Sequence, residues 1–341
     1  MKIIVDAFGG DNAPLAVLKG CALAVKEYGV EILLAGNEKK IRQVSEEHQI
    51  SLEGMEIVNA DTVISMEDEP TEVIKGKADC SMAVGFRLLA DGRGEAFVSA
   101  GSTGAMVVGA SMIVKRIKGV KRAALASVIP NARSCHMLLD LGANVECRPE
   151  MLMQFGIMGS AYMEKIMNVQ NPKVGLANIG TEETKGGELQ LAAHKLLKRA
   201  PVNFTGNIEA REIPFGQCDV VVADGFTGNI VLKLTEGLGS YFGKYMKSMF
   251  LSSTMTKLAA LFMKEQVKSF KRKMDYTEYG GAPLLGIARP VIKAHGSSNE
   301  IAFKNAIRQA VEFTQKGIVD IIRENVELAS KSTADNAEPD A

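Results

Sequence analysis

Short apolar runs alternate along the chain with longer stretches in which apolar residues recur at the three-to-four-residue spacing of a helix. The short runs contain many β-branched residues, which favours strands. Strands that alternate with helices are typical of mostly parallel sheets with helices on both faces. We therefore predict an α/β fold in α/β/α layers. The expected strands are residues 3–7, 31–35, 56–59, 96–100, 125–129, 137–141, 174–178, 203–206 and 220–223.

The loop at 99–105, Ser-Ala-Gly-Ser-Thr-Gly-Ala, follows one of these strands and precedes a helical pattern. Backbone N–H groups at such a turn bind anions, and glycine lets the anion approach the backbone. Ser102 and Thr103 add hydroxyl donors, and Gly104 leaves room. The alternative is that glycine and serine serve only as turn and cap residues. The loop alone leaves both interpretations open.

Further strand-end loops combine glycine with acidic, amide, hydroxyl or basic side chains. Ligand sites in sheets of this kind form at the carboxyl ends of the strands. Several such loops are more than turn chemistry requires, so together they predict a phosphate-type site. Asp6 and Asp11 either order this site or receive a ligand hydroxyl or amide. The candidate residues in these loops are Asp6, Gly9, Gly10, Asp140, Asn144, Asn178, Thr181, Lys185, Asp224, Thr227, Asn229, His295, Gly296 and Ser297.

The side-chain chemistry of these candidates suggests different roles. Lys185 offers the point charge that phosphate sites use, or is a solvated lysine at a helix start. The amide of Asn229 offers a donor to an oxyanion, or caps a helix. We expect Asp140 and Asn144 to hold a neighbouring loop. His295 is expected to contact an anion or substrate, with core packing as the alternative, because no triad or nucleophile-elbow pattern accompanies it.

Residues 242–274 have apolar positions at helical spacing, and the polar residues 252–254 divide them into two predicted helices. Eight lysines and arginines lie on the other faces, against the single acid Glu265. Such a basic amphipathic hairpin lies on an anionic bilayer, meets an acidic partner, or buries its apolar stripe in a dimer interface. These roles can coexist. The residues expected at this surface are Phe250, Leu251, Lys257, Leu258, Phe262, Lys264 and Lys268.

The composition narrows the class of protein. Among 341 residues, 40 lysines and arginines balance 40 aspartates and glutamates, which gives no reason to expect bulk nucleic-acid binding. Five cysteines without Cys-x-x-Cys spacing indicate neither a zinc site nor a disulfide framework, and they suggest a reducing cytoplasm. Asp6 interrupts the first apolar run, which argues against a signal peptide. No apolar stretch reaches the ~18 residues of a spanning helix.

Six ordered motifs carry a resemblance to a known family. They are VDAFGGDNAP at 5–14, SAGSTGA at 99–105, LDLGAN at 139–144, GTEETKG at 180–186, ADGFTGN at 223–229 and KAHGS at 293–297. In these motifs, and in order from residue 1 to about 328, the chain resembles the bacterial acyl-carrier-protein:phosphate acyltransferases of phospholipid synthesis. Two positions depart from the family, which more often has Met at Phe8 and Asn at Ser102. With Ser at position 102, we expect the backbone N–H groups of this loop to contribute more to anion binding than the side chain at 102.

The resemblance implies transfer of a long fatty acyl group from acyl carrier protein to inorganic phosphate, without a cofactor. The acyl phosphate would serve a membrane glycerol-3-phosphate acyltransferase. The resemblance also implies a homodimer and a fold like phosphotransacetylase and the isocitrate and isopropylmalate dehydrogenases. That fold suggests one domain from 1–119 and 276–328, a second from 120–275, and a disordered tail at 329–341. Phosphate would lie against the loops at Ser102-Thr103 and His295-Gly296, with Lys185 and Asn229 as catalytic residues.

Three other classes of protein share part of this pattern. A phosphotransacetylase-like enzyme would use a coenzyme A thioester as donor at the same phosphate loops. A nicotinamide-dependent dehydrogenase of the same fold would carry metal-binding aspartates. The third alternative is a protein without enzyme activity, an anion-binding module at a membrane surface. For an enzyme of the resembled family, delivery of a lipid-like product favours a cytoplasmic protein docked peripherally on the membrane.

Overall fold

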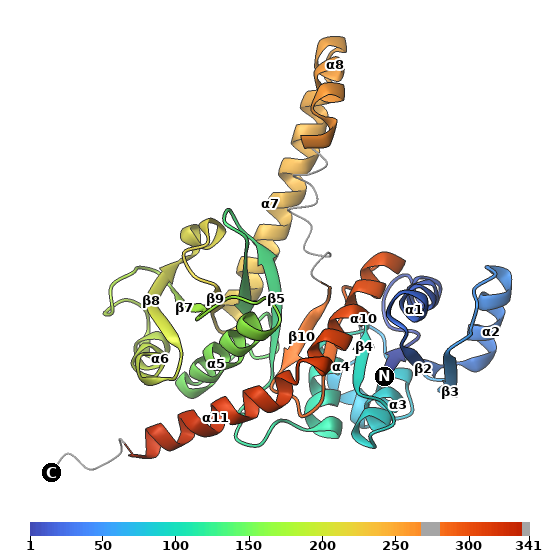
Figure 1. Cartoon of the computed structure of the whole chain (residues 1–341), viewed down its shortest axis with the longest axis horizontal. Helices are drawn as coiled ribbons and strands as arrows, with labels where there is room; N and C mark the ends of the chain where they lie inside the picture. The colour runs from blue at the N-terminus through green and yellow to red at the C-terminus, as the bar shows by residue number, and fades with distance from the viewer. Residues whose placement is uncertain (267–279, 336–341) are drawn as a thin grey trace.

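The computed structural model describes residues 1–266 and 280–335. Over these residues, eleven strands form one sheet in the order β3-β2-β1-β4-β11-β10-β5-β6-β9-β7-β8 (Figure 1). The strands are β1 (Lys2–Asp6), β2 (Glu31–Gly36), β3 (Met55–Asn59), β4 (Ala96–Ser99), β5 (Ala124–Pro130), β6 (Cys135–Leu139), β7 (Lys173–Asn178), β8 (Asn203–Glu209), β9 (Val220–Val222), β10 (Ala282–Leu285) and β11 (Val291–Lys293).

All nine predicted strands are confirmed, with ends that differ by a few residues. β10 and β11 were not predicted. They have only four and three residues, which is too short to show a period-2 pattern. Their position explains their importance, because they join β4 to β5 in the middle of the sheet.

Most strand pairs are parallel, as predicted, but three consecutive pairs in the middle are antiparallel. These are β11 with β10, β10 with β5, and β5 with β6. Because three reversals separate them, β3-β2-β1-β4-β11 and β6-β9-β7-β8 are two parallel groups that run in opposite directions. The division into domains at 120 and 276 stays a prediction.

Helices cover both faces of the sheet, which confirms the α/β/α layers. They are α1 (Leu15–Tyr28), α2 (Glu38–Glu47), α3 (Ser81–Ala90), α4 (Thr103–Gly109), α5 (Pro149–Lys165), α6 (Glu188–Arg199), α7 (Gly225–Leu251), α8 (Thr254–Phe262), α10 (Glu300–Gln315) and α11 (Ile318–Asp335), with short turns η1 (Pro70–Ile74), η2 (Ala110–Val114) and η3 (Ala210–Phe215).

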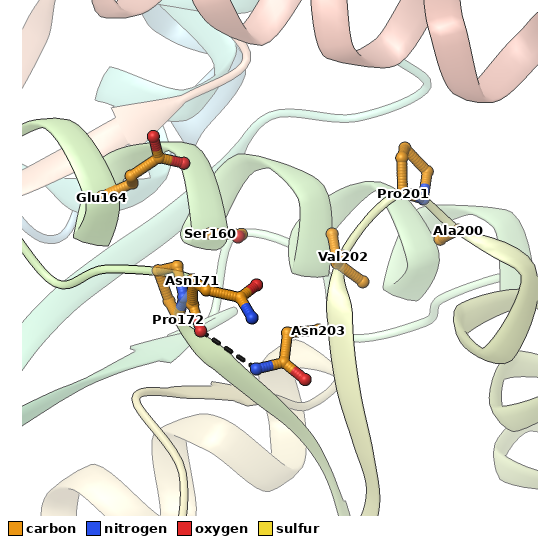
Figure 2. Close-up of a pocket in the computed structure, with 8 residues that line it drawn as sticks. All are labelled: Ser160, Glu164, Asn171, Pro172, Ala200, Pro201, Val202 and Asn203. Atoms are coloured by element: carbon orange, nitrogen blue, oxygen red, sulfur yellow. Dashed lines mark hydrogen bonds between the residues drawn. The ribbon is translucent and has the colours of Figure 1, made fainter.

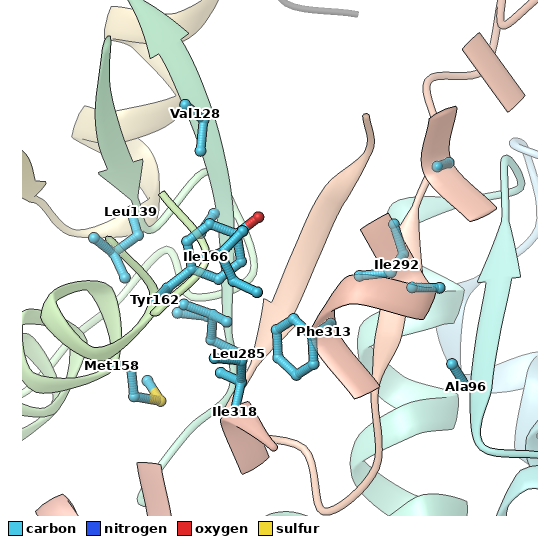
Figure 3. Packing of buried hydrophobic residues seen from close by; sticks show 14 of the residues in the cluster. Ala96, Val128, Leu139, Met158, Tyr162, Ile166, Leu285, Ile292, Phe313 and Ile318 are labelled. Atoms are coloured by element: carbon cyan, nitrogen blue, oxygen red, sulfur yellow. The ribbon is translucent and has the colours of Figure 1, made fainter. Parts of the chain in front are cut away.

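Alternate strand residues enter two separate hydrophobic clusters, one on each face. Ile3 and Val5 of β1 belong to the cluster that contains residues of α1, α5, α6, α10 and α11. Ile4, between them, belongs to the cluster that contains residues of α3 and α4. In the first cluster, Tyr162 and Phe313 lie close together (Figure 3), and the Tyr162 hydroxyl accepts from Nε2 of Gln309 at 2.7 Å.

The C-terminal tail begins later than the sequence predicts. α11 continues to Asp335, and Ala329 on this helix is buried, so a disordered tail from 329 is wrong for residues 329–335. Residues 336–341 lie outside the described part of the chain.

The helices predicted at 242–274 are part of a longer projection from the body of the protein. α7 runs for 27 residues from Gly225 and extends away from the body (Figure 1). It ends at Leu251, close to the predicted break, and the Ser253 hydroxyl accepts from the backbone N–H of Thr256 as α8 begins. Residues 267–274, including the predicted surface residue Lys268, lie outside the described residues. Over the residues that are described, no helix is both long and apolar enough to cross a bilayer.

Candidate active site

Three of the candidate loops, which follow strands of the first parallel group, form one cluster. The backbone N–H of Ala294 donates to the carbonyl of Ser99 at 2.8 Å. The N–H of Asp11 donates to the carbonyl of Gly296 at 2.8 Å, and the Asn12 amide donates to the carbonyl of Ser297 at 3.1 Å. The loops after β1, β4 and β11 are therefore tied together at the carboxyl end of these strands.

Gly9 and Gly10 permit this close approach. A Cβ on Gly9 would lie 2.6 Å from the backbone nitrogen of Gly101, and one on Gly10 would lie 2.9 Å from the carbonyl oxygen of Gly296. Gly10 also has φ +99°, which side chains rarely adopt. Gly9 thus leaves space for the backbone of Gly101, while Gly10 both leaves space and adopts a conformation that favours glycine.

The loop after β4 combines both interpretations of its sequence. Ser102 is the N-cap of α4, because its Oγ accepts from the N–H of Ala105 at 3.4 Å. The backbone N–H groups of Ser102, Thr103 and Gly104 donate to no acceptor among the described residues. The Ser102 hydroxyl is engaged in the turn, while these amides are free to bind an anion.

His295 presents a ring nitrogen to solvent. Its side chain is exposed, so core packing is wrong for this residue. The ring Nδ1 accepts from the N–H of Ser297 at 3.2 Å and lies 2.8 Å from the Ser297 hydroxyl. In a neutral ring with Nδ1 as acceptor, we assign the proton to Nε2. His295 therefore offers a donor in a loop that is bonded to the loop of the free amides.

Asp6 lies beneath these loops. Its carboxylate is buried and accepts from the Ser81 hydroxyl at 2.6 Å, the Ser99 hydroxyl at 2.7 Å and the N–H of Phe8 at 3.2 Å. Burial raises the pKa of this carboxyl. Of the two predicted roles, Asp6 fills the ordering one, because its oxygens face protein donors. Ser81 and Ser99 were not singled out in the sequence.

A second cluster forms at the ends of β6 and β9. Asp140 is buried and accepts four hydrogen bonds, from the backbone N–H groups of Leu125, Ala143 and Asn144 and from the Asn144 amide. Burial raises the pKa of Asp140. The N–H of Gly225 donates to the carbonyl of Asn144 at 2.8 Å. The predicted loop-holding role of Asp140 and Asn144 agrees with these bonds.

Asp224, Thr227 and Asn229 belong to the same cluster at the start of α7. Asp224 caps this helix, since its carboxylate accepts from the N–H of Thr227 at 2.9 Å and from its hydroxyl at 2.8 Å. Asn229 is therefore not the cap. Its Nδ2 donates to the carbonyl of Leu141 at 2.9 Å, and the second hydrogen of this amide has no acceptor among the described residues.

The loop after β7 is held by its own hydrogen bonds. The Asn178 amide donates to the carbonyl of Lys185 at 3.0 Å, and Thr181 and Lys185 are exposed. The Asn207 amide of β8 donates to the carbonyl of Glu182 at 2.7 Å and so supports this loop. Over residues 1–266 and 280–335, no hydrogen bond or ion pair joins the loop to the other clusters. Sequence reasoning missed Asn207 because the predicted strand ended at 206.

The first two clusters lie at the carboxyl ends of the two parallel groups of strands. The strands of the two groups run in opposite directions, so in a flat sheet the two sets of loops would lie at opposite ends of the strands. Each strand is rotated by about 20–25° relative to its neighbour, and this twist changes the direction in which the loops point. Lys233 of α7 lies near enough to Lys293 of β11 that its charge lowers the pKa of Lys293.

A surface cavity of about 420 Å³ lies elsewhere (Figure 2). Asn171 and Pro172 line it before β7, and Pro201 and Asn203 line it at the start of β8, with Glu164 from α5. The candidate loops follow the opposite ends of these strands. This cavity is therefore not part of the candidate site.

Comparison with known proteins agrees with the six sequence motifs. Residues 1–321 match the family model described as fatty acid synthesis protein. A phosphate acyltransferase of Alkaliphilus oremlandii is 48% identical over 326 residues, which cover 96% of this chain and 97% of the relative. One of Clostridium novyi is 46% identical over 328 residues, which cover 96% and 99%. The chain belongs to this family of phosphate acyltransferases. As a member of the family, it is an acyltransferase.

Two solved structures share the fold of this chain. A phosphotransacetylase from Streptococcus pyogenes has a TM-score of 0.63 and 18% identity, with 94% of each chain covered. A phosphotransacetylase from Staphylococcus aureus has a TM-score of 0.62 and 17% identity, with 93% of this chain and 94% of that chain covered. The predicted phosphotransacetylase-like fold is thus confirmed.

Proposed function

We propose that this phosphate acyltransferase moves a long-chain fatty acyl group from an acyl carrier protein thioester to inorganic phosphate. The acyl phosphate would then enter phospholipid synthesis. The observation that carries the proposal is the convergence of three glycine loops with free backbone N–H groups at Ser102, Thr103 and Gly104, and with His295 in one of these loops. Free amides and a ring N–H are the donors that a phosphate anion accepts.

The reaction needs no covalent enzyme intermediate. A phosphate oxygen attacks the thioester carbonyl carbon and forms the new carbon–oxygen bond, which gives a tetrahedral oxyanion. The oxyanion collapses, the carbon–sulfur bond breaks, and the thiolate leaves with the electron pair. The amides and His295 would hold phosphate, Lys185 would offset its charge, and the free hydrogen of Asn229 would stabilise the oxyanion. Asp140 and Asp224 would keep the start of α7, which carries Asn229, in place.

The donor is tested by measuring thiol release from acyl carrier protein thioester with and without phosphate, with acyl-coenzyme A as the competing donor. We expect release that requires phosphate and that is faster from the carrier protein at equal concentration. Faster release from acyl-coenzyme A would favour the phosphotransacetylase-like alternative. Thioester loss without phosphate would contradict acyl transfer to phosphate.

The projection formed by α7 and α8 would serve assembly and membrane binding. Large apolar side chains recur every three or four residues along α7 and remain exposed, and only Gly225 and Gly228 of this helix are buried. They are Phe226, Ile230, Leu234, Leu238, Tyr241, Phe242, Tyr245 and Met249. A face of this length suits a second copy of the chain in a homodimer.

The tip of the projection suits an anionic membrane. Leu251, Leu258 and Phe262 are exposed there, beside Lys257 and Lys264. Apolar side chains flanked by lysines bind the surface of anionic bilayers. Peripheral docking on the cytoplasmic face would bring the acyl phosphate to the membrane glycerol-3-phosphate acyltransferase that we expect to consume it.

The triple variant Phe250→Glu, Leu251→Glu and Leu258→Glu is expected to lose sedimentation with anionic vesicles, because three carboxylates would replace apolar contacts. Met112→Glu is the matched control, since Met112 is also exposed but lies on η2 in the body. Light scattering would show whether either variant changes the dimer. Unchanged sedimentation of the triple variant would refute the membrane role of the tip.

A further inference from the structure

Lys293, the last residue of β11, carries a buried ammonium group at the candidate site. Its side chain is 8% exposed. Nζ donates to the carbonyl oxygens of Ala294 at 2.6 Å and Ala100 at 3.2 Å. In the part of the chain that the structure describes, no carboxylate forms an ion pair with it. Lysine is rarely buried without such a partner, so this charge calls for an explanation.

The two hydrogen bonds of Lys293 join two of the three clustered loops. Ala100 belongs to the loop after β4, and Ala294 to the loop after β11. Because a trans peptide is planar, its N–H points away from its carbonyl. With the Ala294 carbonyl directed at Nζ, the N–H of His295 is directed to the opposite side. The N–H groups of His295 and Gly296 donate to no acceptor among the described residues. The lysine therefore fixes the direction of the free N–H of His295.

The charged groups near Lys293 are Asp6, Asp11 and Lys233, and neither carboxylate forms an ion pair with its ammonium. Asp6 of β1 already accepts from Ser81, Ser99 and Phe8. Asp11, in the loop after β1, is exposed, and Lys233 of α7 adds a second positive charge. The ring of His295 follows two residues later in the same loop. A buried positive charge that is not paired with a carboxylate attracts an anion more strongly than a solvated one.

We propose that Lys293 is a positioning residue of the phosphate site, whose buried ammonium locks the loops after β4 and β11 together and draws the anion to the amides of His295 and Gly296. This assignment rests on the proposed function. It differs from the role of Lys185, which is exposed and whose Nζ has no partner among the described residues.

The ionisation of Lys293 provides a test that a purely structural role would not meet. Burial lowers the pKa of Lys293 to about 8, an effect that Asp6 and Asp11 oppose and Lys233 reinforces. The ammonium is therefore charged at neutral pH and loses its charge as the pH rises above 8. Phosphate itself titrates in this range, so sulfate, which keeps its charge, is the second probe.

The experiment compares the unaltered enzyme with Lys293→Met and Lys293→Arg from pH 6.5 to 9.5. Lys39→Met, at an exposed lysine of α2, is the matched control. At pH 7, Lys293→Met is expected to raise the KM for phosphate by about 10–100-fold, the usual effect of losing a charged donor, with a smaller change in kcat. The ratio of its KM to that of the unaltered enzyme should shrink as the pH rises past 8. A ratio that stays constant with pH would overturn the proposal.

Lys293→Arg keeps the inference testable if Lys293→Met does not fold. Arginine stays charged at every pH used, so its sulfate affinity should not fall above pH 8, whereas that of the unaltered enzyme should. Equal falls in both proteins would overturn the assignment of Lys293. Normal phosphate-dependent thiol release with an unchanged KM in Lys293→Met would overturn this assignment alone. Thiol release that is independent of phosphate in the unaltered enzyme would instead overturn the proposed function.

Discussion

Lys185→Ala is expected to lower kcat/KM for phosphate by about 10²–10³, because it removes the point charge that offsets the incoming anion. The Lys185 side chain is exposed, and its Nζ makes no hydrogen bond or ion pair with the described residues. The variant should therefore keep the stability of the unaltered enzyme. Thiol release as a function of phosphate concentration measures the loss.

The matched control for Lys185 is Lys195→Ala on α6, which removes an exposed lysine from the same part of the surface. We expect this control to keep its activity. Near-normal turnover of a folded Lys185→Ala enzyme would show that the charge at 185 is not required. A similar loss in both variants would point to the general surface potential instead.

Asn229→Ala is expected to reduce kcat by about 10²–10³, the usual effect of removing one oxyanion donor. The same change removes the hydrogen bond from Nδ2 to the carbonyl of Leu141, which should lower stability by about 1 kcal/mol. The loss in rate corresponds to about 2.7–4 kcal/mol, so it should exceed the loss in stability. Steady-state kinetics and thermal unfolding measure the two effects.

Thr235→Val is the matched control that separates a loss of stability from a loss of kcat. Thr235 lies further along α7, and its hydroxyl donates to the carbonyl of Val231 at 2.8 Å. Its loss should cost comparable stability and leave kcat unchanged. If Asn229→Ala slows turnover no more than Thr235→Val does, the amide of Asn229 does not stabilise the oxyanion.

Local sequence patterns predicted most of the sheet, because each predicted strand has enough apolar residues to show its type. β11 shows the limit. Its three residues include Lys293, a side chain that normally indicates a surface position, so neither the strand nor the buried lysine stands out. The residue that caps α7 also differs from the sequence alternative. Asp224, and not Asn229, caps this helix, which begins at Gly225.

The meeting of the loops after β1 and β4 could be predicted, because parallel strands bring their carboxyl ends to one edge. The loop at 293–297 joins them through β11, a strand that the sequence did not predict. The roles of single side chains within these loops could not be predicted. Whether Asp6 faces a ligand depends on Ser81 and Ser99, which are distant in sequence and donate to it. The relation between the two clusters depends on three antiparallel pairs and on the twist of the whole sheet, which no local pattern records.

Product analysis tests the central claim most directly. The unaltered enzyme is mixed with acyl carrier protein thioester and phosphate, and the released thiol and the acyl phosphate, trapped with hydroxylamine, are counted together. We expect one acyl phosphate for each thiol, and neither product when phosphate is omitted. Thiol release accompanied by free fatty acid, or equal release without phosphate, would contradict acyl transfer to phosphate at this site.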